Sequence, residues 1–307
     1  MKRLLNTYIA AMLVFTISIT AQDKFECRKL TSDTERKGFP SWSPDGKSII
    51  YQVTNHYDSL GNNGLWIISK DGSGAKQIFN GIAEHPKWSP DNKFIVFDAD
   101  SGNSIKLIST ETGEVKSFIP DSIQIRNGGL PCWSPDGSLI TFVERTGPSL
   151  CVYNMNTGNL KSIFSKNGMV PLPACFTTDG ENIIIALMDL QTRKSSMQKI
   201  NLSDGSAEQI QIDNENFYRH LAISPDGSLI IFAAITERYL GLYITLSEGG
   251  KSIPLTVTSG FHNESPSWSP DGKSVIFTSG RSGGGIWIME VEIDQLKKEL
   301  LELNKLE

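Results

Sequence analysis

The chain has 307 residues, 39% of them hydrophobic and 21% charged, which is the composition of an ordinary globular protein with a sizeable buried core. The formal net charge is −5 and no run of lysine and arginine forms a basic surface, so nucleic acid is excluded as an expected partner. All-β domains often exceed about 200 residues as one unit, so the length suits either one large domain or two average ones.

The first 21 residues differ from the rest of the chain. Met1–Arg3 is short and basic, Tyr8–Ile19 is apolar, and Ala21 supplies a small residue for signal-peptidase cleavage. The apolar stretch is shorter than the roughly 20 residues of a membrane span, so no transmembrane span is expected. Residues 1–21 are predicted to be a signal peptide, which makes the protein periplasmic or secreted, with Gln22 as its first residue. An uncleaved amphipathic or anchoring helix is the alternative.

A seven-residue motif recurs six times along the rest of the chain. Its third residue, which we call the marker, is tryptophan in four copies and stands at positions 42, 88, 133, 176, 223 and 268, at intervals of 43 to 47 residues. A period of this length holds four short strands with their turns, which is one blade of a β-propeller. The six copies are Pro40–Gly46, Pro86–Asn92, Pro131–Gly137, Ala174–Gly180, Leu221–Gly227 and Pro266–Gly272.

Each repeat predicts four antiparallel strands from the turns that it contains. The Ser-Pro-Asp-Gly sequence forms a tight turn, because Pro sets φ, Asp hydrogen-bonds the local backbone and Gly accepts a positive φ. In the first repeat, β-rich runs follow at Ser48–Tyr51, Leu65–Ile68 and Lys76–Phe79, with polar loops or turns between them. The marker aromatic is predicted to pack between blades, where burial of a large ring contributes most.

The last repeat lacks a fourth strand of its own. No further turn and strand follow Met289, whereas Phe25–Thr31, ahead of the first repeat, has the pattern of a fourth strand. Pairing the two closes the ring and covers two edges that would otherwise promote aggregation. Residues 22–291 are therefore predicted to be one all-β domain, a six-bladed β-propeller of four-stranded antiparallel blades closed by an N-terminal strand.

Residues 292–307 follow a different period. Ile293, Leu296, Leu300 and Leu303 recur at three and four residues among charged side chains, which predicts a short amphipathic C-terminal helix. Such a helix either docks on the propeller or binds a partner through its apolar face.

The four cysteines, Cys27, Cys132, Cys151 and Cys175, do not have the spacing of a metal-binding knuckle. Cys132 and Cys175 stand at the same repeat position, one residue before the marker, in neighbouring blades. Corresponding Cα atoms on adjacent inner strands usually lie farther apart than the ~4.4–6.8 Å that a disulfide requires. We therefore expect four buried thiols without a disulfide.

The repeats resemble those of the TolB-type propellers, a family of WD-like Pro-Asp repeats. The resemblance rests on the Trp-Ser-Pro-Asp-Gly hairpin with Pro two residues before the Trp, and on the Ser279–Gly284 loop of the last repeat. It covers about residues 25–291 and implies the six-bladed fold. TolB itself carries an N-terminal α/β domain, and nothing in this sequence has the pattern of one. Blades four and five have also lost the marker tryptophan, so the envelope role of TolB is not implied.

One sequence matches a catalytic motif without its context. Gly280–Gly284 fits the G-x-S-x-G pattern of serine hydrolases, which requires a strand-to-helix elbow and a histidine later in the chain. No histidine follows Ser282, and the predicted fold offers no elbow. A hydrolase is not expected.

The candidate ligand site lies where the chain enters the innermost strands. His85 and His220 stand three residues before their markers, and Glu84, Arg219 and Glu264 stand four before theirs. The loops that precede the first strand and follow the second strand of each blade converge at one mouth of the central channel. The predicted site there consists of Glu84, His85, Arg126, Arg219, His220, His262 and Glu264.

The predicted function is that of an exported, non-catalytic binding or scaffold propeller that recognises a protein or glycan ligand at this mouth, with no metal or cofactor. The architecture is also similar to that of the oligogalacturonate lyases, whose channel-mouth histidines hold a divalent metal. That resemblance would assign a metal to His85, His220 and His262 in a metal-dependent polysaccharide lyase. A third reading is an envelope-complex scaffold that binds its partner through the 292–307 helix. Propellers host all three functions, so the fold does not decide among them.

Overall fold

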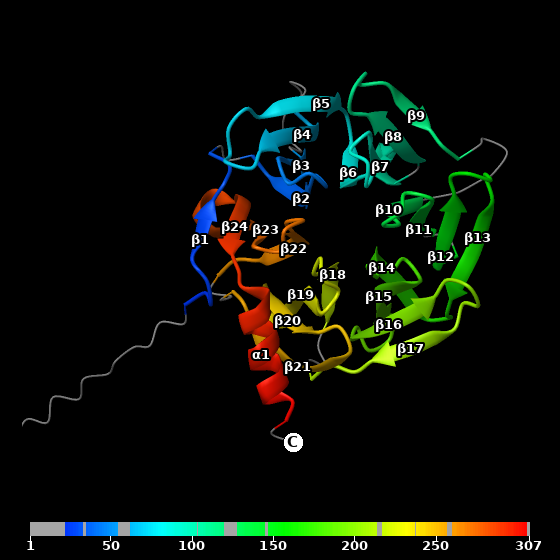
Figure 1. Ribbon diagram of the computed structural model, residues 1–307. Coiled ribbons are helices and arrows are strands. Elements are labelled where there is room, and N and C mark those ends of the chain that lie inside the picture. Colours follow the sequence, from blue (N-terminus) through cyan, green and yellow to red (C-terminus); the bar gives the residue numbers. More distant parts are fainter. Residues whose placement is uncertain are drawn as a thin grey trace, which may run out of the picture.

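The computed structural model describes residues 22–32, 35–54, 62–102, 104–119, 128–144, 147–213, 217–236, 238–256 and 260–305. The predicted signal peptide, residues 1–21, lies outside these ranges, as does Arg126. Within them, 24 strands form six four-stranded antiparallel sheets arranged in a ring (Figure 1). The predicted six-bladed propeller is confirmed.

Blades one to five each use four consecutive strands, with the first strand innermost and the fourth outermost. Two short 3-10 turns, η1 (Asp100–Gly102) and η2 (Arg281–Gly283), follow the second strands of blades two and six. The strands of blades one to five are β2 (Lys37–Trp42), β3 (Ser48–Val53), β4 (Gly64–Ser69) and β5 (Lys76–Asn80); β6 (Ala83–Trp88), β7 (Phe94–Ala99), β8 (Ser104–Ser109) and β9 (Val115–Ser117); β10 (Gly128–Trp133), β11 (Leu139–Glu144), β12 (Ser149–Asn154) and β13 (Leu160–Ser165); β14 (Met169–Phe176), β15 (Asn182–Asp189), β16 (Ser195–Asn201) and β17 (Ala207–Ile210); and β18 (Tyr218–Ile223), β19 (Leu229–Thr236), β20 (Tyr239–Leu246) and β21 (Gly249–Pro254).

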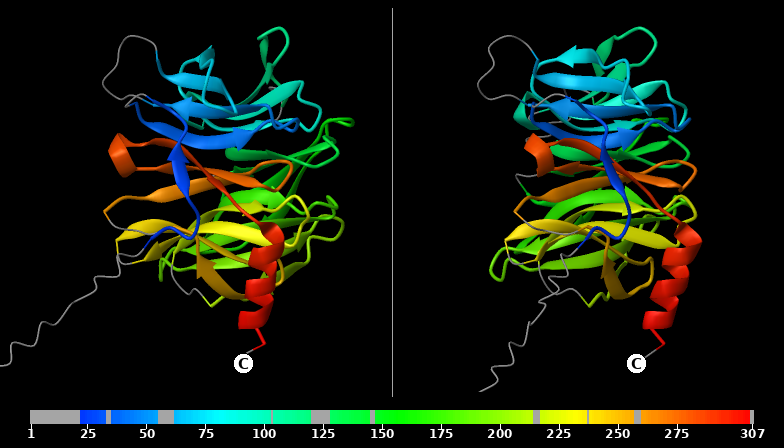
Figure 2. Two further views of the ribbon diagram at one scale, coloured as in Figure 1. Left: turned by 60° about the vertical axis from the view of Figure 1, so that its left-hand side comes forward. Right: turned by 90° about the vertical axis from the view of Figure 1, so that its left-hand side faces the viewer.

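Blade six is closed by the N-terminal strand, as the sequence predicts. Its own strands are β22 (Asn263–Trp268), β23 (Ser274–Ser279) and β24 (Gly285–Glu290), and β1 (Cys27–Lys29) is its outermost strand (Figure 2). The pairing continues past β1, because the Leu30 amide donates to the Ile286 carbonyl at 2.8 Å. The paired residues are Cys27 with Met289, Arg28 with Ile288 and Lys29 with Trp287.

The repeated motif is explained by one hydrogen-bonded turn. In blade one, Ser43 Oγ donates to Asp45 Oδ1 at 2.7 Å and accepts from the Ser48 amide at 2.9 Å, while Gly46 has a φ of 68°. The same hydroxyl-to-aspartate bond recurs in the other five blades, with threonine in place of serine in blade four. The hydrogen bond from Ser43 lowers the pKa of the Asp45 carboxyl. These aspartates therefore build turns, and the face that carries them is called the turn-rich face below.

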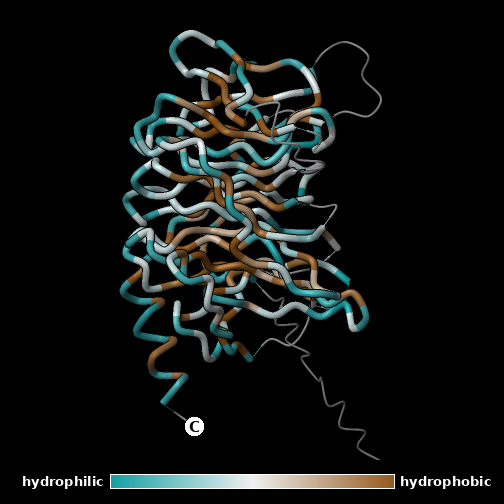
Figure 3. Tube along the Cα trace, turned by 90° about the vertical axis from the view of Figure 1, so that its right-hand side faces the viewer, coloured by the Kyte–Doolittle hydropathy of each residue, from teal (hydrophilic) through white to brown (hydrophobic). Residues whose placement is uncertain are grey.

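The hydrophobic core lies between neighbouring blades, and the markers contribute to it as predicted. Trp42 of blade one packs with Ile286 and Ile288 of blade six, and Phe176 of blade four packs with Val143 of blade three. Apolar segments run through the interior of the disk, between loop faces that are mostly hydrophilic (Figure 3). All four cysteines are free thiols, as expected, but only Cys151 is buried, because the other three residues lie at the edge of the propeller core and keep part of their surface exposed.

The C-terminal helix α1 (Ile293–Leu303) docks on blade five against β20 and β21. The Leu296 and Leu300 side chains are fully buried there, and Asn304 Oδ1 accepts the Lys251 amide at 2.9 Å. The helix is shorter than the predicted 292–307 segment. Because its apolar face contacts its own propeller, that face is not presented to a partner. Among the residues that the structure describes, no helix is long and apolar enough to cross a membrane.

Candidate binding site in the central channel

The innermost strand of every blade carries a β-bulge near its start. In β2 the pairing with β3 skips the residues between Gly38 and Ser41, and the register shifts at the corresponding position in four other blades and one residue earlier, between Pro171 and Ala174, in blade four. The residue three before the marker lies in each bulge, and we call these six residues the bulge ring. In chain order they are Phe39, His85, Leu130, Pro173, His220 and Ser265.

The bulge ring has an unusual backbone conformation. All five members other than proline have a φ between 47° and 60°, in the left-handed region. Residues with side chains rarely adopt this region, at a cost on the order of 1–3 kcal/mol each, and Pro173 cannot adopt it because its ring fixes φ near −65°. Residues as different as phenylalanine, histidine and leucine share this conformation, so it is imposed by the propeller fold and not by the residue type. A bulge re-aims a side chain, and here one from each blade is directed at the axis.

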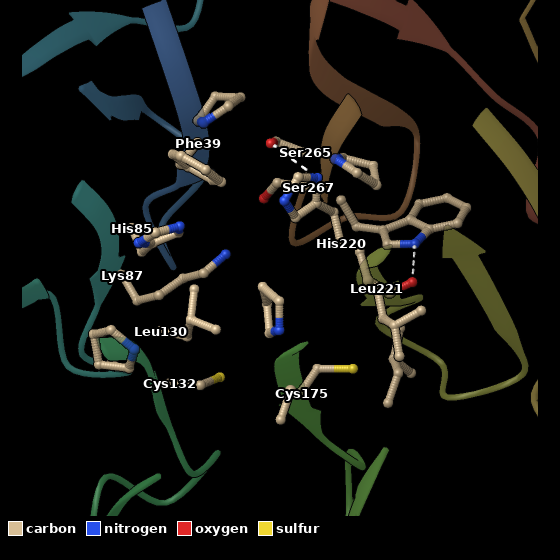
Figure 4. Close-up of a pocket in the computed structure, with 18 of the residues that line it drawn as sticks. Phe39, His85, Lys87, Leu130, Cys132, Cys175, His220, Leu221, Ser265 and Ser267 are labelled. Atoms are coloured by element: carbon tan, nitrogen blue, oxygen red, sulfur yellow. Dashed lines mark hydrogen bonds between the residues drawn. The ribbon is translucent and has the colours of Figure 1, made fainter. Parts of the chain in front are cut away.

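The bulge ring lines a cavity of about 260 Å³ in the channel (Figure 4). The cavity continues past the residues one before the marker, including Lys87, Cys132 and Cys175, and reaches Pro225 and Pro270 on the turn-rich side of blades five and six. Every blade contributes to its wall, so this is a site that no single blade could form.

His85 is oriented by a buried carboxylate. Its Nδ1 lies 2.9 Å from Oδ2 of Asp98, whose side chain is fully buried and also accepts the Leu130 amide at 3.2 Å. Because Nδ1 is engaged by Asp98, Nε2 is the nitrogen left for a ligand. Ligand atoms of Glu84, His85 and Asp98 all lie within 4.8 Å of one another.

Phe39 connects the two histidines of the bulge ring. Its ring centroid lies 3.9 Å from that of His85 and 5.4 Å from that of His220, with an edge-on arrangement in the second pair. Blades one, two and five thus meet through three rings at this level of the channel. The aromatic contacts fix the positions of both imidazoles.

His220 is a buried imidazole with a lowered pKa. Burial, followed by the nearby charges of Arg219 and His85, holds its pKa well below the ordinary value of 6.5. Arg219 Nη2 donates to Glu264 Oε2 at 2.6 Å, and this ion pair lies beside the imidazole. Two predicted site residues therefore neutralise each other next to a third.

Ser265, His220 and Glu264 do not form a catalytic triad. Ser265 Oγ lies 3.5 Å and Glu264 Oε2 lies 3.6 Å from the same nitrogen of His220, Nδ1. In a triad the nucleophile and the acid bond opposite imidazole nitrogens, at shorter distances. The G-x-S-x-G match also fails, because Ser282 lies in η2, between two strands of a hairpin, with a φ of 50°.

Arg281, next to Ser282, has a structural role. Its guanidinium donates to Asp23 and to Asn263 Oδ1 and lies 5.0 Å from the centres of the Phe261 and Trp287 rings. Asp23 belongs to the segment just before β1, so this arginine holds the closing segment to blade six.

Of the predicted site residues, His85 and His220 line the cavity, whereas Glu84 lies next to His85 and the Arg219–Glu264 pair lies next to His220. His262 lies elsewhere: its side chain is exposed, and its Nδ1 accepts the Leu240 amide of β20 at 3.1 Å. It does not line the cavity with His85 and His220.

Sequence reasoning missed Lys87, which lines the cavity from the position one before the marker. Cys132 and Cys175 occupy the same repeat position and also line it. Burial raises the pKa of both thiols, so they are protonated at neutral pH. Residues two apart on a strand share a face, and this alternation links Lys87 to His85 and could have found it.

Fold and site together define a six-bladed propeller with a channel cavity to which all six inner strands contribute. One similar solved structure is TolB from Acinetobacter baumannii, with 20% identity and a TM-score of 0.63 over 84% of this chain and 64% of that one. A second is an oligogalacturonate lyase from Vibrio parahaemolyticus, with 14% identity and a TM-score of 0.60 over 89% of this chain and 96% of that one. A third is a gluconolactonase from Xanthomonas campestris, with 10% identity and a TM-score of 0.66 over 90% of this chain and 93% of that one. This chain therefore spans slightly less than two thirds of the length of that TolB. No protein-family model and no curated protein matches it. At these identities the likeness shows the fold alone.

Proposed function

We propose that this protein is an exported binding propeller that recognises a protein or carbohydrate ligand at its central channel without transforming it. The cavity carries the proposal, because the bulges direct one side chain from each blade to a common axis. Imidazoles, an ammonium group and apolar rings meet there, which are groups that orient a ligand. Among the residues that the structure describes, no serine or cysteine is paired with a histidine in the geometry of an activated nucleophile.

Export follows from the basic, apolar and small-residue order of residues 1–21. N-terminal sequencing of the protein recovered from its natural host tests it, with Gln22 expected as the first residue. Recovery of soluble cytoplasmic protein that begins at Met1 would contradict export and leave the binding proposal to stand on the cavity.

The binding test uses a glycan array and a panel of envelope proteins, followed by titration of any ligand that binds. Replacing Arg219 by Ala and His220 by Gln should weaken a confirmed ligand at least tenfold, about 1.4 kcal/mol, with little change in melting temperature. Lys47→Ala is the matched control, because this lysine is 80% exposed on the turn-rich face. Equal loss in the control, or none in the double variant, would show that the ligand binds elsewhere.

A metal-dependent polysaccharide lyase is the second candidate, and the Glu84–His85–Asp98 cluster is the observation that favours it. An imidazole with two carboxylates is a donor set that first-row metals accept. The fit is incomplete, because His85 Nδ1 and Asp98 Oδ2 already bond each other and His262 is engaged with Leu240. Near-stoichiometric metal in the purified protein, with unsaturated products from uronic-acid oligomers that His85→Ala abolishes, would establish the lyase and overturn the binding proposal.

A further inference from the structure

Among the described residues that line the channel cavity, Lys87 is the one lysine or arginine. It belongs to β6, and its ammonium group extends into the space between the imidazoles of His85 and His220 (Figure 4). Within the part of the chain that the structure describes, no carboxylate or carbonyl oxygen accepts a hydrogen bond from its Nζ. A charged group taken out of bulk water in this way requires either ordered water or a counter-charge.

The described part of the cavity wall supplies no counter-charge, because no aspartate or glutamate is among the residues that line it there. Of the nearby carboxylates, Asp98 bonds His85 and Glu264 bonds Arg219, while Glu84 lies beside His85 and Asp98 and does not line the cavity. The pKa of His220 also reflects positive charge at this point. Burial lowers this pKa most, and the charges of Arg219, His85 and Lys87, in that order, lower it further. The cavity is therefore suited to a negatively charged group.

The rest of the wall is largely apolar. Phe39, Leu130, Ile223 and Trp268 line it together with six prolines from five of the six blades, two of which, Pro225 and Pro270, lie in turns. At about 260 Å³ the cavity lies just below the usual range of ligand pockets, roughly 300–1,000 Å³. It has room for a small molecule or for the end group of a larger one, and its wall favours an apolar body next to the charge.

We propose that the channel binds an apolar carboxylate, with the carboxylate paired to Lys87 and the apolar body against Phe39, Leu130 and Trp268. Two sources share this chemistry, a free aromatic or branched-chain acid and the C-terminal residue of a protein partner. This inference rests on the proposed function, because it specifies the chemical group that enters the binding channel.

Calorimetric titration of the mature protein with two acid–amide pairs tests the proposal. Benzoate and benzamide represent the free acid, and N-acetyl-L-leucine and N-acetyl-L-leucinamide represent a C-terminal residue. At least one acid should bind, and its amide should bind at least tenfold more weakly because it lacks the charge. Lys87→Met, which keeps the length of the side chain, should reduce binding of that acid at least tenfold. Lys93→Met is the matched control, because this lysine is 75% exposed on the turn-rich face.

The outcomes separate the two sources. Binding of benzoate alone assigns the site to free acids, whereas binding of N-acetyl-L-leucine assigns it to a C-terminal residue. The inference is overturned if neither acid binds, if an amide binds as tightly as its acid, or if Lys87→Met binds the acid as tightly as the unaltered protein. Should Lys87→Met not fold, Lys87→Gln replaces it. If a macromolecular ligand is lost with the Arg219 and His220 substitutions but no acid binds, the proposed function stands and this inference fails.

Discussion

Shortening Leu30 to alanine tests whether the N-terminal segment closes the ring. Leu30 follows β1 and is only 6% exposed, in a cluster with Trp42, Ile286 and Ile288 from blades one and six. If the segment were only loosely attached to blade six, Leu30 would contribute little to stability. If it closes the ring as the structure shows, its side chain holds two blades and the closing strand together.

The expected loss of stability can be worked out from the burial. Leucine to alanine removes three carbon groups, worth about 0.8 kcal/mol each when buried, or about 2.4 kcal/mol in total. A cavity would add to this, but Leu30 lies beside an outermost strand that can relax inward, so the loss should stay near 2–3 kcal/mol. Unfolding entropy of about 2.1 cal/mol/K per residue gives about 0.6 kcal/mol/K for 307 residues, so the melting temperature should fall by about 4 °C.

Urea unfolding followed by tryptophan fluorescence measures the free energy, and calorimetry measures the melting temperature. Leu190→Ala is the control, because Leu190 is 46% exposed and its loss should change stability by no more than about 0.5 kcal/mol. A change for Leu30→Ala no larger than that of the control would refute closure by the N-terminal segment.

Three further predictions concern the helix, the buried histidine and the thiols. Leu300→Ala should lower the free energy of unfolding in urea by about 2–4 kcal/mol, because Leu300 is fully buried. The adjacent Leu301→Ala should lower it by less than about 0.5 kcal/mol, because Leu301 is 42% exposed. Equal losses would mean that α1 is not docked. Burial holds the pKa of His220 well below its ordinary value of 6.5, so as the pH falls from 7.5 to 5.5 the unfolded chain binds this proton more readily than the folded one and stability decreases; His220→Gln should remove this part of the decrease, measured by unfolding at both pH values. Burial raises the pKa of Cys132 and Cys175, so at pH 8 a thiol reagent should label them rapidly only after unfolding, and rapid labelling of the native protein would contradict their placement.

Most of the fold is predictable because its information is local and repeated. The Ser43–Asp45 hydrogen bond and the positive φ of Gly46 fix one turn, and the same requirements recur at every copy of the motif. Closure was predictable as well, because an unpaired edge on β24 has a matching strand pattern only at Phe25–Thr31. The end of α1 was harder to predict than the closure. Periodicity marks a helical face, but the hydrogen bond between Asn304 and Lys251 at the end of the helix depends on the tertiary structure.

The candidate site was predictable only in part. Repeat position placed His85 and His220 together, because equivalent residues of different blades share a level of the channel. It could not show that Asp98, which lies opposite Glu84 on the neighbouring strand β7, bonds His85, since that contact depends on the register of the two strands. It also grouped His262 with the channel, although the loop before β22 turns this side chain toward β20. Side-chain direction in a loop is set by packing, which a repeat alignment does not contain.

The two ends of the inner strands differ in how strongly geometry determines their residues. At the turns, Ser or Thr, Asp and Gly or Asn recur because the hydrogen bonds and the left-handed φ require them. At the bulges the backbone adopts the same conformation with phenylalanine, histidine, leucine or serine, so geometry leaves the side chain open. The fold does not determine which residue type stands at these positions, although the side chain is directed at the axis in every blade. Ligand recognition can therefore decide the residue type there. The bulge ring and Lys87, rather than the repeated motif, are therefore where we expect specificity to lie.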